Sequence, residues 1–158
     1  MKRILTGVGA FLFLSSLAYG KENLSNANQF NHAEYMQATS SGQRKAGPVV
    51  KGTLFLNSEK KSIEFLDEKG ASVTSIQYDS VKSILYEKSS TPRYAEAVII
   101  SPLFLLSRSK KHYLTVQYTD AAGVGEFVIF HLDKGNAREA IAKTEAETGK
   151  RVERAEEK

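Results

Sequence analysis

Short segments of alternating apolar and polar residues, separated by turn signals, constrain the fold of this chain most strongly. Four such segments follow one another between residues 49 and 87, and Gly70 in one of their turns suits a positive φ. Two more occupy residues 112–118 and 126–132. Short strands in consecutive order favour an antiparallel sheet, because parallel strands need long crossovers. The 126–132 segment is apolar on both faces, which predicts a central strand or one covered on both sides.

A helix is predicted at the C-terminal end of the domain. Asn136 followed by Glu139 has the form of a capping box, and Ala140 and Ile141 belong to a thin apolar stripe at helical spacing. Gly149 suits the left-handed position just past a helix end. The expected fold class is therefore mainly β with a C-terminal helix, that is, α+β.

Composition divides the chain into four parts. Residues 1–20 have the charged start, apolar stretch and small-x-small site of a secretory signal peptide of bacterial type. Residues 21–48 are rich in Asn, Gln, Ser and Ala without a clear period, so we expect a flexible N-terminal arm. The folded domain is expected at 49–152, and a charged tail at 153–158. The mature protein would be exported, to the periplasm or beyond the cell.

Charge and cysteine content exclude several classes of function. The formal net charge is +4, and without Lys2 and Arg3 of the signal it falls to +2. So weak a bias does not indicate a nucleic-acid partner, because phosphate affinity needs a concentrated basic face. The chain has no cysteine, so disulfides, thiolate nucleophiles and cysteine-ligated metals are excluded.

Catalytic motifs are missing from the sequence. There is no nucleophile elbow, no His-Glu-x-x-His pair and no phosphate-binding glycine loop. His112 and His131 lie on the two later strands and could approach each other across the ladder if those strands pair, but no carboxylate or third histidine that could complete a metal site is evident nearby. We therefore predict no catalytic residue, no metal and no cofactor. An envelope hydrolase using one of these histidines is kept as an alternative.

Four stretches of the sequence carry a resemblance to a known fold. They are Gly52-Thr-Leu-Phe-Leu, the eleven residues from Ile76 to Tyr86, Lys111-His-Tyr-Leu-Thr-Val, and the helix ending in Thr148-Gly-Lys. In this order they resemble exported bacterial proteins of unassigned function with a pleckstrin-homology-like (PH-like or GRAM-like) domain. The resemblance implies a bent antiparallel sheet or partial barrel capped by one helix. It also implies a protein that acts by binding.

An apolar run at residues 97–106, read AVIISPLFLL, interrupts the strand pattern and is followed by basic residues. Three interpretations of it remain open. The run covers a side of the sheet, as apolar segments usually do; or it dips into a bilayer while lysines meet anionic head groups; or it forms a protein interface. It is too short to span a membrane. The candidate ligand-contacting or membrane-contacting residues are Leu103, Phe104, Arg108, Lys110 and Lys111.

The function expected from the sequence is that of a non-enzymatic, exported binding or interaction module. Its partner would be a cell-envelope protein or a membrane surface. The first alternative is an anionic-lipid binder that uses residues 97–111, and the second is the hydrolase.

Overall fold

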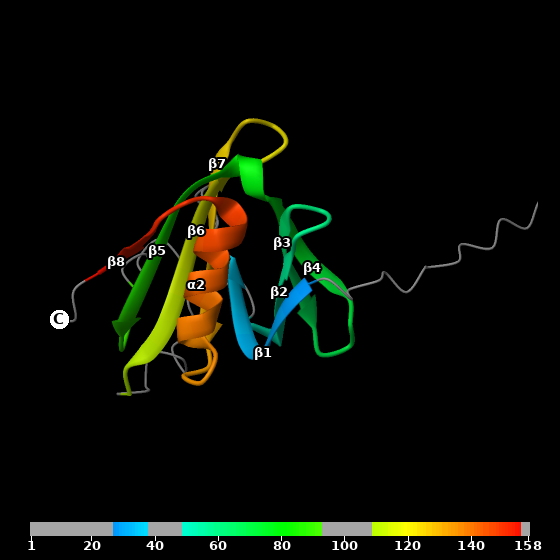
Figure 1. Ribbon diagram of the computed structural model, residues 1–158. Coiled ribbons are helices and arrows are strands. Elements are labelled where there is room, and N and C mark those ends of the chain that lie inside the picture. The colour runs from blue at the N-terminus through cyan, green and yellow to red at the C-terminus, as the bar shows by residue number, and fades with distance from the viewer. Residues whose placement is uncertain (1–26, 38–48, 93–108, 156–158) are drawn as a thin grey trace, which may run out of the picture.

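The computed structural model describes residues 27–37, 49–92 and 109–155, which form one eight-stranded sheet and one α-helix. The helix lies across one side of the bent sheet (Figure 1). The elements in chain order are β1 (Ala27–Gln37), β2 (Val50–Asn57), β3 (Ser62–Asp67), β4 (Ser72–Gln77), the 3₁₀ turn η1 (Tyr78–Ser80), β5 (Val81–Ser89), β6 (Lys111–Thr119), β7 (Gly125–Leu132), α2 (Ala137–Thr148) and β8 (Val152–Arg154).

The strands are arranged in the order β4-β3-β2-β1-β7-β6-β5-β8, and every pair except β5–β8 is antiparallel. The predicted fold class, mainly β with one C-terminal helix on a bent antiparallel sheet, is confirmed. One detail differs from the consecutive order of the first four predicted strands. After β4 the chain turns through η1, and β5 then joins the far half of the sheet and pairs with β6.

The first strand corrects the prediction of a flexible arm at residues 21–48. Residues 27–37 form β1, which pairs with β2 on one side and β7 on the other and so joins the two halves of the sheet. Phe30, Tyr35 and Met36 are all at most 5% exposed. These few apolar side chains are buried because β1 is central, so a segment of polar composition still contributes to the core.

A bulge explains why no period of two was evident in this segment. The register between β1 and β2 shifts between Phe30 and Ala33, and His32 adopts a φ of 57°. An extra residue in a strand moves the following side chains to the other face, so the apolar positions before and after the bulge do not alternate in one series.

The core lies between the inner faces of the two halves of the sheet and α2. Tyr35, Phe65 and Phe130 form a ring cluster at its centre, with centroids 5.5 to 5.9 Å apart. β7 is central as predicted, and Val128, Ile129 and Phe130 are fully buried although they alternate between faces. Both faces of this strand are therefore covered.

Gly52 is required where β2 passes β3. A Cβ at this position would lie 1.9 Å from the carbonyl oxygen of Leu66 and 2.9 Å from a ring carbon of Phe65. No side chain fits in that space, so the strand needs a glycine here for packing and not for its φ.

The helix occupies the predicted range but begins differently. Ala137, Ala140 and Ile141 pack into the core cluster, and Gly149 ends the helix with a φ of 64°. The predicted capping box is wrong, because the side chain of Asn136 makes no capping hydrogen bond. Asn136 has helical φ and ψ, whereas a capping residue is usually extended.

The predicted charged tail at 153–158 is also wrong in part. Val152–Arg154 form β8, which runs parallel to β5, and Val152 is 3% exposed. The backbone N–H of Ala155 donates to the carbonyl oxygen of Tyr86 at 2.9 Å. Val152 supplies the apolar anchor that the charged residues beyond it lack.

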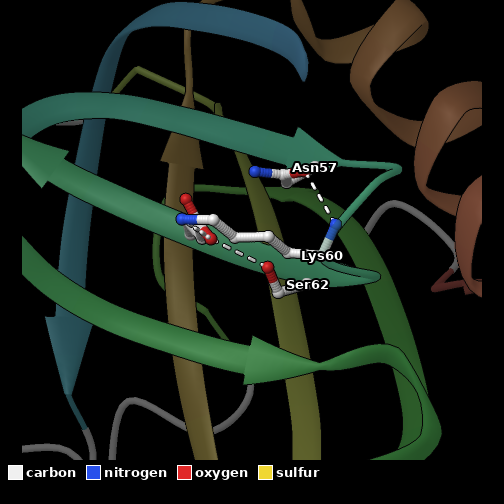
Figure 2. A network of polar contacts seen from close by, with 4 residues as sticks. Asn57, Lys60 and Ser62 are labelled. Atoms are coloured by element: carbon white, nitrogen blue, oxygen red, sulfur yellow. Dashed lines mark hydrogen bonds and ion pairs between the residues drawn. The ribbon is translucent and has the colours of Figure 1, made fainter. Parts of the chain in front are cut away.

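A polar network closes the turn between β2 and β3 (Figure 2). Asn57 Oδ1 accepts from the backbone N–H of Lys60 at 3.0 Å, and Ser62 Oγ donates to Glu64 Oε1 at 2.9 Å. Lys60 Nζ lies 3.5 Å from the same carboxylate oxygen, so the buried Glu64 has both a hydrogen bond and an ion pair. These contacts satisfy polar side chains that the turn buries.

Candidate binding rim at the ends of β5, β6 and β7

The candidate residues from the sequence fall partly within the described structure. Leu103, Phe104 and Arg108 lie outside the described residues. Lys110 is exposed just before β6, and Lys111 opens that strand opposite Ser89 of β5. Of the five candidate residues, only Lys110 and Lys111, at the start of β6, lie within the described ranges.

Lysines from three neighbouring elements surround this end of the sheet. Lys88 lies opposite His112 in the β5–β6 register. His112 in turn lies opposite Leu132, the last residue of β7. Lys134 follows two residues later and therefore lies at the same end of the sheet. We call the four residues Lys88, Lys110, Lys111 and Lys134 the basic rim.

The pKa of His112 reflects this surrounding charge. It is lowered from its ordinary value, first by burial and then by the positive charges of Lys88, His131 and Lys134, while Asp133 opposes the shift. Nδ1 of His112 lies 2.6 Å from the hydroxyl of Tyr86, and the two rings stack with centroids 6.0 Å apart. Burial and the nearby lysines therefore favour the neutral imidazole of His112.

A row of ionisable side chains crosses the other face of the sheet at the same level. Cross-strand partners share a face, and successive pairings link one residue on each of five adjacent strands. The row consists of Lys51, Glu34, His131, Tyr113 and Glu87. Lys111 lies on this face too, two residues before Tyr113, so the row borders the basic rim.

A hydrogen-bonded pair of side chains, His131 and Glu34, forms the centre of this row. Nδ1 of His131 lies 2.9 Å from Oε2 of Glu34, and both side chains are about one-fifth exposed, at 19% and 21%. The hydrogen bond from His131 lowers the pKa of Glu34; burial opposes the shift, and the charges of His131, Lys111 and Lys51 support it. Glu34 therefore remains ionised well into the acid range.

Tyr113 stays protonated beside this pair. Its ring is fully buried and lies 5.7 Å from that of His131, and burial together with the charges of Glu34 and Glu87 raises the pKa of its phenol. A phenol held in this state does not act as a nucleophile at neutral pH. The contacts within the row thus favour an ionised Glu34 and a protonated Tyr113.

The predicted approach of His112 and His131 is wrong. β6 and β7 do pair, but His131 lies opposite Tyr113 and His112 opposite Leu132, so the two imidazoles point to opposite faces. Each has its own partner, Glu34 for His131 and Tyr86 for His112. Two histidines on opposite faces cannot share a metal or act as one catalytic pair. In the described ranges no group of three metal-ligating side chains is found.

A polar hollow of about 480 Å³ opens beside the bulge of β1. Its lining includes His32 and Glu34 from β1, Lys51 and Thr53 from β2, and Glu68 from the turn between β3 and β4. Sequence reasoning missed this hollow because it assigned residues 21–48 to an arm. The aromatic and apolar residues Phe30, Tyr35 and Met36 were the signal that could have indicated a strand there.

Comparisons with known proteins do not show a family for this chain. No family model matches the chain, and no curated protein matches it. Among solved structures the chain is similar to the Vps36 N-terminal PH domain, with 18% identity over 79% of this chain and 81% of that chain and a TM-score of 0.47. In the part of the chain that the structure describes, no helix has the length and apolar character needed to cross a bilayer.

Proposed function

We propose that this chain is a non-catalytic, exported binding module that engages an anionic surface of the cell envelope through the basic rim. The observation that carries the proposal is that Lys88, Lys111 and Lys134, from three adjacent elements, lie at one end of the sheet, with Lys88 on the face of His112 and Lys111 on the opposite face. Lys110 is exposed next to them. Clustered lysines of this kind attract anionic head groups at about 1 kcal/mol per charge near the surface.

Two acidic groups near the rim have partners within the fold. Glu34 is paired with His131. Asp133 accepts hydrogen bonds from backbone N–H groups of the turn that leads into α2, at 2.8 Å from Gly135 and 3.0 Å from Asn136. Both carboxylates thus make contacts within the fold, and Lys111 of the rim also acts electrostatically on Glu34.

Vesicle sedimentation tests the proposal. The protein is expected to bind phosphatidylcholine vesicles that contain phosphatidylglycerol, and to leave pure phosphatidylcholine vesicles unbound. Replacing Lys110 and Lys111 with Glu should lower the partition coefficient at least about thirtyfold, because two lysines contribute about 2 kcal/mol. The pair Lys88→Glu and Lys134→Glu should have a similar effect.

A matched control is available on the same chain. Lys82 and Lys143 are exposed and lie on β5 and α2, away from the rim. Their joint replacement by Glu changes net charge by the same amount and should leave most of the binding intact. Equal loss in control and rim variants, or undiminished binding of the rim variants, would refute the basic rim as the contact surface.

Export is a separate part of the proposal, supported by the signal-like composition of residues 1–20. Expression of the full chain in a bacterial host should yield a periplasmic protein whose first residue is Lys21. Recovery of the uncleaved chain from the cytosol would contradict this part and leave the binding part standing.

A further inference from the structure

The strand β4 forms one end of the sheet. Within residues 27–37, 49–92 and 109–155 the two terminal strands are β4 and β8, and β4 pairs only with β3 (Figure 1). β4 has six residues, whereas β8 has three. A terminal strand presents backbone N–H and C=O groups to which a further strand can bond. β4 therefore offers the longer of the two described edges.

The hydrogen bonds between β3 and β4 show which residues of β4 face outward. The backbone N–H of Tyr78 donates to the carbonyl oxygen of Lys61 at 2.8 Å. This bond continues the register in which Gln77 lies opposite Ser62. Along an antiparallel pair, the backbone groups of successive residues point alternately toward the neighbouring strand and away from it. The N–H and C=O groups of Gln77 and Ser75 therefore point away from β3.

The outward edge of β4 lacks the features that usually keep edge strands apart, which are charged side chains, prolines and bulges. Residues 71–78, ASVTSIQY, contain neither a charged residue nor a proline. The register shift in the β3–β4 pairing lies before Thr74, and the pairing from Thr74 to Gln77 is regular. Ser75 and Gln77 are also exposed. This part of β4 is thus suited to pairing with another strand.

We infer that β4 pairs antiparallel with β4 of a second copy of this chain, about a two-fold axis. Two-fold dimers are the commonest soluble homo-oligomers. In an antiparallel ladder, outward-facing residues bond to outward-facing residues. β4 spans residues 72–77, so the register that pairs most of it places Ser75 of one copy opposite Ser75 of the other. Both copies use the same edge, so the pairing stops at two chains.

The charges around β4 favour a second copy as the occupant of this edge. Because residues 71–78 are uncharged, the pairing brings no like charges opposite each other. The two-fold axis places residues 67–70 of one copy at the same end of the joined sheet as residues 58–61 of the other. The first stretch, DEKG, has two acidic residues and one lysine, and the second, SEKK, has one acidic residue and two lysines. Net charges of opposite sign therefore meet at both ends of the interface.

Sedimentation velocity tests the inference on the purified chain. The weight-average mass should rise from that of a monomer toward that of a dimer between about 10 µM and about 1 mM, the range of a weak association. Ser75→Lys places two like charges opposite each other at the axis and should abolish the rise. Ala142→Lys, at an exposed position of α2, adds the same charge and should leave the rise intact.

Proline blocks the same edge without adding charge. Ser75→Pro removes an outward-facing N–H, and proline is tolerated on edge strands where the N–H faces solvent. It should abolish the dimer and leave the circular dichroism spectrum unchanged. If it unfolds the chain, Ser75→Lys still tests the edge.

Hydrogen exchange reports on the edge of the unsubstituted chain. The Ser75 N–H should exchange on the order of tenfold more slowly at about 1 mM than at about 50 µM, because exchange then requires opening of the dimer. The N–H of Ile76, which faces β3, should change little.

Cysteine pairing locates the axis, since the chain contains no cysteine. Mild oxidation of Ser75→Cys should give a disulfide-linked dimer in high yield. The Cα atoms of directly opposed, hydrogen-bonded residues lie about 5.5 Å apart, which suits a disulfide. Lys143→Cys, at an exposed position of α2, should give little dimer under the same conditions.

Three results would overturn the inference. One is a chain that stays monomeric and whose Ser75 N–H exchanges rapidly at every concentration, which would mean that the edge stays open. Another is a monomer in which this N–H exchanges slowly, which would assign the edge to another segment of the same chain. The third is a dimer that persists in both Ser75→Lys and Ser75→Pro, which would place the interface elsewhere. The basic rim lies on other elements, so none of these results bears on vesicle binding.

Discussion

The side-chain amide of Asn136 donates a hydrogen bond of 2.9 Å to the carbonyl oxygen of Asn31. This contact joins the first turn of α2 to the bulge of β1, 105 residues earlier in the chain. The side chain of Asn31 is held as well, because its Oδ1 accepts from Thr53 at 3.1 Å and from Gln29 at 2.7 Å. The bulge is thus fixed from the helix and from the neighbouring strand.

Replacing Asn136 with Ala should lower the free energy of unfolding by about 1 kcal/mol, the usual net value of a hydrogen bond. Asn136→Asp is the informative comparison. Aspartate is as good a helix cap as asparagine, but it has no amide donor for Asn31. We expect both variants to lose stability in chemical denaturation. Full retention of stability by Asn136→Asp would show that the hydrogen bond to Asn31 makes no net contribution to folding.

Phe30→Ala should lower the free energy of unfolding by about 3–5 kcal/mol, the range for truncating a buried aromatic side chain. The measurement is the midpoint and slope of urea denaturation. Ser75→Ala, at an exposed position of β4, should change stability by less than about 0.5 kcal/mol. A protein starting at Val49 should lack a cooperative transition altogether, because it loses the strand between β2 and β7. Cooperative unfolding of that shortened chain would contradict the central role of β1.

Gly52→Ala should destabilise the protein severely, by about 3 kcal/mol or more, because the added methyl group overlaps the backbone of β3. Gly125→Ala is the control, since a Cβ there would meet no atom within 4 Å. Thermal denaturation of the two variants should give a large decrease in Tm for the first and little change for the second. Similar Tm values would mean that β2 and β3 can separate without cost.

Acidification should weaken the fold in two steps. The pKa of His112 and the pKa of Glu34 are both lower in the folded protein than their ordinary values of 6.5 and 4.5. A group with a depressed folded pKa stabilises the protein above its unfolded pKa, and that stability is lost as the pH falls through the folded pKa. The free energy of unfolding should therefore decrease first below about pH 6.5 and again below about pH 4.5.

Substitutions separate the two steps in stability measured against pH. His112→Asn should remove the first decrease, and Glu34→Gln should reduce the second. Glu139→Gln, at an exposed position of α2, serves as the control and should leave both. If Glu34→Gln has the same pH profile as the unsubstituted protein, the pair with His131 makes no net contribution to folding.

Tyr86→Phe should raise the pKa of His112. At neutral pH the imidazole is uncharged, so the Tyr86 hydroxyl can donate to its Nδ1 and favour the neutral form. Titration of the imidazole signals by NMR measures the change, with His32 in the same spectrum as an internal reference. An unchanged or lower pKa for His112 would mean that the hydroxyl accepts from the ring.

Much of this fold was predictable because its signals are local. The alternation around Leu114 and Phe130 predicted β6 and β7, and Gly149 marked the end of the helix. The features that were missed depend on distant contacts. Phe30 and Tyr35 form a strand only because β2 and β7 pair with them, and Asn136 binds Asn31 across the fold. The sequence also does not fix the register between β6 and β7. It therefore could not show that His112 and His131 point to opposite faces of the sheet. Lys111 became a candidate site residue from its charge alone, whereas only the pairing of β1 with β7 placed Glu34 beside His131.

The parallel pairing of β8 with β5 has a consequence for how the protein behaves at high concentration. A sheet edge with unpaired backbone groups invites strands of other molecules to add to it. Here the edge of β5 is occupied by three residues of its own chain, and the new edge carries the charged side chains of Glu153 and Arg154. A strand so short and so charged is a poor template for further addition. The C-terminal segment therefore protects the sheet against polymerisation from that side.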